Sequence, residues 1–197
     1  MQRADAGDAQ GRAEPRAGGQ VGAGAGGAIR LILAAILAGG QSRRFGTDKA
    51  AALYRGRPLL DHMRALGAEQ ADAVVVVGRD DGVCDRPHAG LGPLGGIAGA
   101  LAYGAAHGYA SVLTLPCDMP LLPEPLLPAL LRRAPSFCLD APVIGHWPSA
   151  LAPSLLRHIA ESPRRSVQNW ARSIGALPIP SPAPLVNVNT PDDLLAL

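Results

Sequence analysis

LAGGQSRRFGTDK, residues 37–49, follows an apolar run directly and combines three glycines with three cationic side chains. Glycines let a main chain turn tightly and bring its N–H groups close to an anion, while the two arginines and the lysine add positive charge. The run Ile32 to Leu37 is typical of a buried strand, and Lys49 to Leu53 is typical of the opening of a helix. A strand, a glycine-rich loop and a helix N-terminus together predict a phosphate-binding site.

This loop differs from the Walker A motif of the P-loop NTPases. The pattern Gly-x-x-x-x-Gly-Lys-Ser/Thr cannot be placed on it, because Gly40 and Gly46 are one residue too far apart and two residues separate Gly46 from Lys49. The P-loop class is therefore disfavoured. A glycine-rich turn that merely joins a strand to a helix is the alternative interpretation.

Apolar runs alternate with longer helical patterns along the rest of the chain. Ala73 to Val77 and Ser111 to Leu115 are typical of central strands, and the alanine- and glycine-rich Leu94 to His107 between them is typical of a helix packed closely on a sheet. Such βαβ alternation predicts an α/β fold, a Rossmann-like three-layer sandwich with a mostly parallel central sheet in a single domain. Later elements are expected as helices over Pro123–Arg133, Pro153–Glu161 and Ser166–Ile174, strands over Ala176–Ile179 and Leu185–Val188, and a helix from Pro191 with Thr190 as N-cap.

The composition is compatible with one globular domain. A chain of 197 residues that is 48% hydrophobic and 17% charged can bury a substantial core, but it is too short for two full-sized domains. The net charge is only +2 and no dense basic stripe with interleaved aromatics is present, so we expect no nucleic-acid binding. Residues 1–30 are mostly alanine and glycine, so we expect a disordered extension there and the folded domain over residues 31–197.

Arg30 followed by LILAAILA superficially imitates a signal peptide. The run lies too deep in the chain and is shorter than a membrane span, so a core strand is the better interpretation and we expect no membrane association. Cys84, Cys117 and Cys138 have no metal-ligand spacing and leave one cysteine unpaired in any disulfide scheme. A reducing cytoplasm is therefore the predicted location.

Asp118 is a candidate metal ligand. In an open α/β sheet the ligand lies outside the carboxyl ends of the strands, so Asp118, three residues beyond Leu115, should reach the same crevice as the glycine-rich loop. Mg²⁺ favours one or two carboxylates together with phosphate oxygens. An aspartate that caps a turn is the alternative, and the phosphate-binding loop upstream favours the metal.

Gly90 to Gly95 matches the Gly-x-Gly-x-x-Gly fingerprint of dinucleotide-binding proteins. The stretch Arg86 to Ala89 before it is no strand, however, and no acidic residue follows about 20 positions later to hold a ribose. A Rossmann oxidoreductase is therefore disfavoured as an alternative functional class. Gly92 to Ile97 is better interpreted as the opening of a helix whose small residues permit close approach by a nucleotide.

Four blocks of the sequence resemble, in the same order, the motifs of the molybdenum cofactor guanylyltransferases, a MobA-like nucleotidyltransferase family. Residues 37–49 fit every specified position of Leu-Ala-Gly-Gly-x-Ser-x-Arg-x-Gly-x-Asp-Lys. The other blocks are GPLGGI at 92–97, LPCDMP at 115–120 and VNVNTP at 186–191, so the resemblance covers about residues 31–197. It implies a Mg²⁺-dependent enzyme that transfers GMP from GTP to the terminal phosphate of the molybdopterin cofactor and releases pyrophosphate.

The resemblance also implies roles for individual residues. Nucleotide binding is implied for Leu37, Ala38, Gly39, Gly40, Lys49, Asp85 and Asp118. The resemblance assigns Asp118 to the metal. By their positive charge, Lys49 and Arg43 would stabilise the triphosphate and the leaving pyrophosphate. The partners would be GTP and the molybdopterin cofactor as substrates, with molybdoenzymes or cofactor-synthesis proteins as further partners.

Asp85 lies seven residues before the GPLGGI block, the spacing at which family members carry an aspartate that contacts GTP. A carboxylate can accept two hydrogen bonds from the N1–H and 2-amino edge of guanine, which cytosine does not offer. Aspartates at 80 and 81 are neighbouring alternatives, and Val77-Gly78 stands where family members carry an asparagine that contacts the nucleotide. CTP is the nearest alternative substrate, but Ala38-Gly39-Gly40 favours GTP, because enzymes that make the cytosine cofactor tend to carry Ala-Ala-Gly there.

Asn187 and Asn189 alternate with two valines, so in a strand both amides would share one face while Val186 and Val188 face the core. Two neutral amides on one face can orient a phosphate or the second substrate, although they could equally hold the following turn. A non-enzymatic nucleotide sensor is the alternative from another class. It would keep the glycine-rich loop but would need neither Asp118 nor the asparagine pair.

Overall fold

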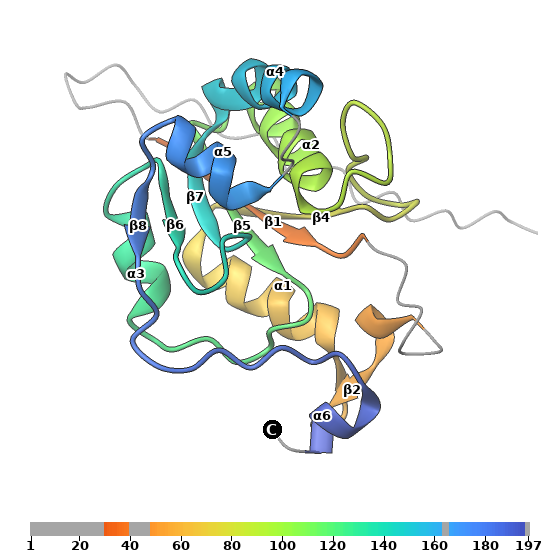
Figure 1. The fold of residues 1–197 in the computed structure, drawn as a ribbon. Coiled ribbons are helices and arrows are strands. Elements are labelled where there is room, and N and C mark those ends of the chain that lie inside the picture. Colours follow the sequence, from red (N-terminus) through yellow and green to blue (C-terminus); the bar gives the residue numbers. More distant parts are fainter. Residues whose placement is uncertain (1–29, 40–47, 163–165, 196–197) are drawn as a thin grey trace, which may run out of the picture.

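Figure 1 shows the fold of the computed structural model, which describes residues 30–39, 48–162 and 166–195. A six-stranded sheet in the order β4-β1-β5-β7-β6-β8 forms its centre. Its strands are β1 (Ile32–Leu37), β4 (Ala73–Val77), β5 (Ser111–Pro116), β6 (Ser136–Cys138), β7 (Gly145–Pro148) and β8 (Leu177–Ile179). β1 pairs in parallel with β4 and β5, and β6 with β8, whereas β7 is antiparallel to both of its neighbours. The predicted mostly parallel sheet is confirmed.

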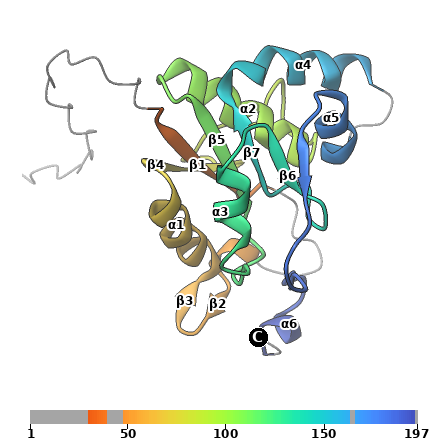
Figure 2. The same cartoon turned by 90° about the vertical axis from the view of Figure 1, so that its left-hand side faces the viewer.

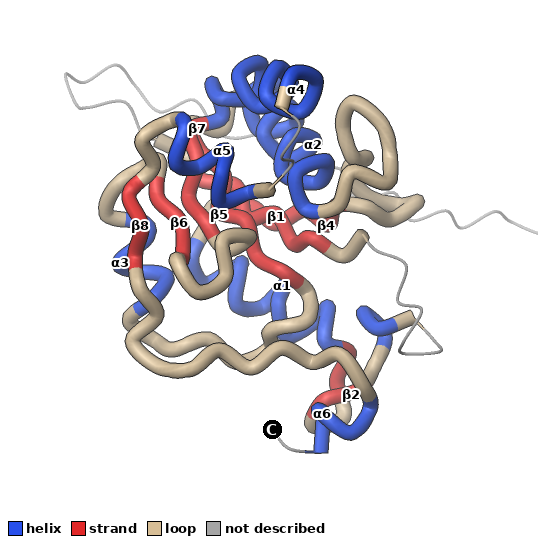
Figure 3. Tube along the Cα trace, in the orientation of Figure 1, coloured by secondary structure: helices blue, strands red, loops and turns tan. Residues whose placement is uncertain are grey.

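Helices cover both faces of this sheet, as the blue and red segments of Figure 3 show. α2 (Pro93–Ala106), α4 (Ala152–Glu161) and α5 (Val167–Ser173) lie on one face, and α1 (Leu59–Gln70) and α3 (Leu126–Leu131) on the other (Figure 2). Side chains of β1 divide between two apolar cores: Leu33 and Ala35 belong to the core beneath α2, α4 and α5, and Ile36 to the core beneath α1 and α3. The predicted three-layer sandwich is therefore confirmed.

β1 is the strand around which the carboxyl edge of the sheet is built. Leu33, Ala34, Ala35 and Ile36 are fully buried, because helices cover both faces of the strand. In the register of the sheet, Leu37 lies opposite Val77 of β4 and Pro116 of β5. Three parallel strands therefore end at the same level, and the segments that follow them start from one edge.

The first turn of α2 approaches this edge closely. Its N-cap, Gly92, has a φ of 62°, a conformation that glycine adopts readily, and Pro93 follows at the first helical position. A Cβ at Gly96 would lie 3.3 Å from Cδ2 of Leu37 and 3.6 Å from Cγ1 of Val77. The small residues of the GPLGGI block thus bring the helix N-terminus against the ends of β1 and β4, and the prediction that this block opens a helix is confirmed.

The predicted helix at Lys49 to Leu53 is wrong. Lys49–Ala51 forms a single 3₁₀ turn, η1, after which β2 (Leu53–Tyr54) and β3 (Arg57–Pro58) form a short hairpin. Its turn holds Arg55 and Gly56 at φ values of 49° and 77°. Tyr54 is buried against Leu59 and Val188, so tertiary packing overrides the local helical preference.

The predicted strand at Leu185 to Val188 is also wrong. Prolines at 180, 182 and 184 lack N–H donors, and in the described part of the chain the segment pairs through one backbone hydrogen bond, from Val188 N–H to the Asp118 carbonyl at 2.9 Å. Val188 is fully buried but Val186 is 42% exposed, so only one of the two valines faces the core.

The other differences are smaller. The predicted helix at Pro123 to Arg133 is shorter, since α3 begins after Pro125, and the final helix forms as predicted, as α6 (Pro191–Leu195). α1, β6 and β7 were not predicted. Apart from Arg30, the expected extension at residues 1–30 lies outside the described residues. None of the helices in the described ranges is long and apolar enough to cross a membrane.

Candidate active site

A cavity of about 640 Å³ lies at the carboxyl ends of β4, β1 and β5. Eight of the residues singled out from the sequence line it: Leu37, Ala38, Gly39, Lys49, Asp85, Asp118, Asn187 and Asn189. Gly40 and Arg43 lie outside the described residues, and their predicted roles stay predictions. The chain therefore brings together groups that are up to about 150 residues apart in sequence, as expected for the carboxyl edge of a parallel sheet.

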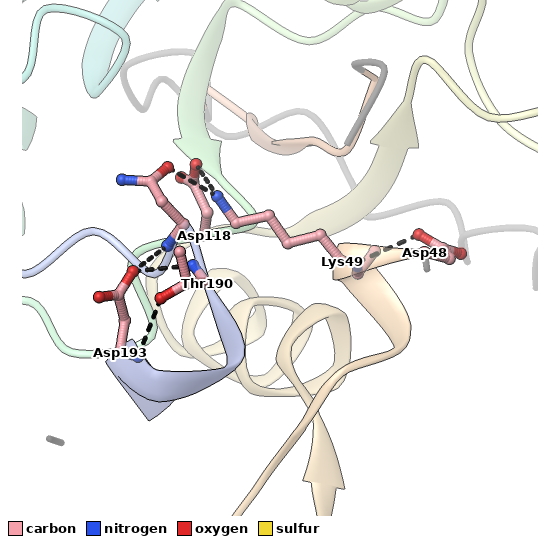
Figure 4. A network of polar contacts seen from close by, with 7 residues as sticks. Asp48, Lys49, Asp118, Thr190 and Asp193 are labelled. Atoms are coloured by element: carbon pink, nitrogen blue, oxygen red, sulfur yellow. Dashed lines mark hydrogen bonds and ion pairs between the residues drawn. The ribbon is translucent and has the colours of Figure 1, made fainter. Parts of the chain in front are cut away.

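Lys49 and Asp118 face each other in this cavity (Figure 4). Nζ of Lys49 donates to Oδ2 of Asp118 at 2.9 Å and to Oδ1 of Asn189 at 3.2 Å. The two charged side chains are 13% and 25% exposed, so the pair is partly shielded from water. The Lys49 ammonium thus connects the end of the glycine-rich loop, the segment after β5 and the C-terminal segment.

The backbone around Asp118 explains this meeting. Cys117 N–H donates to the Leu37 carbonyl at 3.1 Å, which extends the pairing of β5 with β1 one residue beyond the strand. The Asp118 carbonyl then accepts from Val188 N–H, and this bond places Asn187 and Asn189 on either side of the contact. Burial raises the pKa of the Cys117 thiol to about 11, so this cavity-lining cysteine is a neutral thiol at neutral pH and a poor nucleophile.

A capping box fixes Asn189 and the start of α6. Oδ2 of Asp193 accepts from the N–H groups of Asn189 at 2.6 Å and Thr190 at 2.8 Å, while Asp193 N–H donates to Oγ1 of Thr190 at 3.3 Å (Figure 4). These backbone hydrogen bonds lower the pKa of the Asp193 carboxyl. Thr190 was predicted as the N-cap, but Asp193 was not predicted as its partner, although Thr-x-x-Asp is the signal for such a box.

Asp85 occupies another part of the cavity wall. A Cβ at Gly95 would lie 3.4 Å from its Oδ2, and Cβ atoms at Gly78 and Gly96 would lie 3.5 and 3.7 Å from its Oδ1. Its carboxylate therefore stands against bare main chain, and it has no hydrogen-bond or ion-pair partner among the described residues. Burial raises the pKa of this carboxyl. An unpaired, half-buried carboxylate in a cavity is free to accept hydrogen bonds from a ligand.

A second ion pair, which was not predicted from the sequence, lies at the same edge of the sheet. Arg79, just after β4, binds Asp48 through both terminal nitrogens, with Nη1 3.0 Å from Oδ1 and Nη2 2.6 Å from Oδ2. The guanidinium lowers the pKa of the Asp48 carboxyl, chiefly through these hydrogen bonds. A partner 31 residues away carries no local sequence signal, so only the folded chain reveals this pair.

The oxygens around Lys49 fit a divalent cation. Oδ2 of Asp118 and Oδ1 of Asn189 converge on one positive charge, the Lys49 ammonium. A carboxylate and an amide oxygen are hard ligands of the kind Mg²⁺ accepts, with phosphate oxygens and water completing its shell. In the described ranges no group of three or more histidine, cysteine or acidic side chains could hold a metal ion, so a metal here would depend on ligands from a bound phosphate.

The sequence and the fold of this chain match those of known proteins. The model of the MobA-like NTP transferase domain matches residues 34–176. The molybdenum cofactor guanylyltransferase of Rhodobacter capsulatus is 36% identical over 180 residues, which are 83% of this chain and 93% of the relative. The protein of the same name from Acidiphilium cryptum (strain JF-5) is 35% identical over 181 residues, covering 83% and 92%.

Solved structures show the same fold. The molybdopterin-guanine dinucleotide biosynthesis protein A of Archaeoglobus fulgidus superposes with a TM-score of 0.64 at 22% identity, covering 83% of this chain and 95% of that one. A 4-diphosphocytidyl-2C-methyl-D-erythritol synthase superposes with a TM-score of 0.61 at 15% identity, covering 85% and 97%. At these identities the likeness concerns the fold alone.

Proposed function

Because this chain belongs to the MobA-like NTP transferase family, we propose that it transfers GMP from GTP to the terminal phosphate of the molybdopterin cofactor. The observation that carries the proposal is that one cavity contains Asp85, a carboxylate without a partner among the described residues, together with the pair Lys49 and Asp118, which is suited to phosphates and a metal. Asp85 can recognise a base, and Lys49 together with a metal on Asp118 can neutralise a triphosphate. Relatives that match nearly their whole length are named for this activity.

The reaction needs little covalent help from the protein. An oxygen of the cofactor's phosphate attacks the α-phosphorus of GTP, a new P–O bond forms, and the bond from the α-phosphorus to the bridging oxygen breaks to release pyrophosphate. The attacking phosphate is already ionised at neutral pH, so no strong general base is required. Catalysis then consists of positioning the two phosphates and stabilising negative charge on the leaving group.

In the proposed mechanism Lys49 supplies the positive charge that stabilises the leaving group. In the described structure its ammonium is bound to Asp118 and Asn189, so it exchanges these partners for phosphate oxygens when the nucleotide binds. Asp118 and Asn189 are thereby released, and they are the residues that would hold Mg²⁺. When bound, Mg²⁺ would neutralise phosphate charge and orient the α-phosphate. Asn187, on the same segment, is placed to contact the second substrate.

Guanine recognition is assigned to Asp85. Its carboxylate can accept two hydrogen bonds from the N1–H and 2-amino groups, and Gly90, Gly92 and Gly96 line the same cavity without side chains. We further propose a cytoplasmic location. The three cysteines all fall within the described residues, where each is a free thiol, as is usual in a reducing compartment.

The experiment is to incubate the purified protein with Mg²⁺, the molybdopterin cofactor and each of the four NTPs, and to measure pyrophosphate. We expect release with GTP, at least about tenfold less with CTP because one bidentate contact discriminates bases by about 1 to 3 kcal/mol, and none without the cofactor or after chelation of the metal. Equal release with CTP would contradict the guanine assignment. No release with any nucleotide, or release that does not require the cofactor, would contradict the proposed reaction.

A further inference from the structure

Asp48 is the described residue directly before Lys49, and it makes two kinds of contact. Its carboxylate binds both terminal nitrogens of Arg79, and its Oδ1 also accepts from Ala50 N–H at 3.1 Å. The second contact caps the 3₁₀ turn Lys49–Ala51, from which the Lys49 side chain extends. Asp48 therefore connects the segment after β4 to the backbone that carries Lys49.

Gly78, the residue before Arg79, contacts Gly39 at the other border of residues 40–47. A Cβ at Gly78 would lie 2.5 Å from Cα and 2.7 Å from N of Gly39, so the two backbones touch. Ala38 N–H also donates to the Val77 carbonyl at 3.0 Å. Gly39 and Asp48, the two described residues that border residues 40–47, thus both rest on the pair Gly78-Arg79.

The turn that carries Lys49 is accordingly held from two directions. On one side Asp48 is bound to Arg79, which follows β4. On the other side the Lys49 ammonium is bound to Asp118, which follows β5. In the proposed mechanism the contact with Asp118 breaks when Lys49 binds a phosphate, whereas the contact of Asp48 with Arg79 can persist.

We propose that Arg79 is a positioning residue for nucleotidyl transfer, which keeps Lys49 aimed at the triphosphate by binding Asp48. This rests on the proposed function only in assigning the triphosphate to Lys49. Arg79 itself does not line the cavity, whereas Asp48 does, so Arg79 acts through Asp48 rather than on the substrate. The two side chains are 33% and 45% exposed, and a pair at such exposure contributes little to global stability, which leaves placement of Lys49 as its main effect.

The kinetic test compares Arg79→Ala, Asp48→Asn and the double variant. Asp48→Asn keeps an oxygen for Ala50 N–H but loses the charge that binds Arg79, so it separates the ion pair from the cap. A misplacement of about 1 Å can cost about 10²-fold in rate, so we expect each single variant to lower kcat by about tenfold to 10²-fold. The double variant should be no slower than the slower single variant, because both changes remove the same contact. Arg64→Ala, which removes the ion pair with Asp61 on α1, is the matched control and should retain kcat.

A second readout does not require turnover. Lys49 is the only lysine in the sequence, so an amine-acetylating reagent modifies Lys49 and the N-terminal amine alone, and peptide mass spectrometry follows each separately. If Arg79 holds the turn, Lys49 should acetylate faster in Arg79→Ala and Asp48→Asn than in the wild type, relative to the N-terminal amine, and Arg64→Ala should not change this ratio.

Unchanged kcat and unchanged acetylation in Arg79→Ala would overturn the proposal. So would a loss of kcat in Arg79→Ala that Asp48→Asn does not reproduce, because Arg79 would then act on the nucleotide directly. If the wild type releases no pyrophosphate, the proposed function fails, and the acetylation ratio alone still decides whether Arg79 positions Lys49.

Discussion

The two halves of the central sheet contribute to the cavity in different ways. In the parallel half, β4, β1 and β5 all end at the cavity, and the segments that follow them carry Asp85, Lys49 and Asp118. In the other half, no residue of β7, β6 or β8 lines the cavity, and the asparagines arrive on the segment after β8, which joins the site through Val188 N–H and the Asp118 carbonyl. The part of the cavity proposed to bind the nucleotide is thus fixed by strand geometry, and the part proposed to bind the second substrate is fixed by contacts of the C-terminal segment.

This difference predicts where substitutions act. Groups of the parallel half are held by strand ends and ion pairs, so their loss should change the rate or the choice of nucleotide in a folded protein. The C-terminal segment is held by the Asp118 carbonyl, by the burial of Val188 and by its own capping box. Asp118 contacts Lys49 through its side chain and the C-terminal segment through its carbonyl. Its substitution is therefore the strongest test of the difference between the two halves of the sheet.

Asp118→Ala should have the largest effect. It removes the carboxylate proposed to hold Mg²⁺ and leaves the Lys49 ammonium with Asn189 alone, while the backbone carbonyl that accepts from Val188 remains. We expect pyrophosphate release to fall by about 10³-fold, the upper scale for losing one electrostatic stabiliser. Thermal denaturation should show a folded protein. Asp61→Ala, on the exposed surface of α1, is the control, and undiminished turnover in Asp118→Ala would contradict the metal role.

Lys49→Ala should have the next largest effect. If the ammonium neutralises charge on the leaving pyrophosphate, its removal should lower kcat by on the order of 10²-fold. The same substitution leaves Asp118 without its cationic partner, so the affinity for Mg²⁺ in the absence of nucleotide should rise. Titration of Mg²⁺ by calorimetry measures this. Weaker Mg²⁺ binding in Lys49→Ala would show that Lys49 does not compete with the metal for Asp118.

The parallel half is also the half that could be predicted from the sequence. β1 and β4 have the predicted bounds and β5 is one residue longer, because continuous runs of apolar residues are needed where both faces of a strand are covered. The turn at Lys49–Ala51 and the following hairpin were missed, since strands of two residues have no periodicity and Tyr54 is fixed by distant neighbours, Leu59 and Val188. The strands β6 and β7, of three and four residues, are also too short to show a clear periodicity.

The candidate site was predicted to a similar degree. Residues in local motifs, such as Gly39, Lys49, Asp118 and Asn189, lie at the cavity as expected. The partners that hold them in place, Arg79 and Asp193, were not identified. Arg79 meets Asp48 only after β4 has paired with β1, and the separation of 31 residues leaves no trace in spacing.

Gly78→Ala tests the close backbone contact between Gly78 and Gly39 in the parallel half of the sheet, and Gly56→Ala is the matched control. Both glycines have φ near +80°, but a Cβ at Gly56 meets nothing within 4 Å whereas one at Gly78 meets Gly39 at 2.5 Å. Gly56→Ala should therefore cost about 1 kcal/mol in free energy of unfolding and Gly78→Ala roughly 2 kcal/mol, the difference being the added clash. For a chain of this size that corresponds to melting temperatures lower by about 2–4 °C and about 4–8 °C. Equal losses in the two variants would show that Gly39 and Gly78 do not touch.

Asp85→Asn should have the smallest effect on the rate but a specific effect on nucleotide choice. An amide can accept only through its one oxygen, so the variant should retain kcat with GTP within a few fold while the preference for GTP over CTP falls by about tenfold in kcat/KM, within the 1 to 3 kcal/mol of one bidentate contact. Asp80→Asn, a change of the same kind at an exposed neighbour, should keep the preference.

The same substitution should make the unliganded protein more stable. Burial raises the pKa of the Asp85 carboxyl above its unfolded value, so ionisation of the folded protein is penalised at neutral pH and the penalty disappears as the pH falls below the unfolded pKa. Asp85→Asn removes the charge, so its melting temperature should exceed that of the wild type at pH 7 and approach it in acid. Replacing a carboxylate that serves ligand binding should make the protein more stable and less selective between GTP and CTP. Replacing a structural carboxylate would instead make the protein less stable. If Asp85→Asn is less stable at pH 7 and still discriminates GTP from CTP fully, Asp85 holds the loop before α2 and guanine is recognised by other residues of the parallel half.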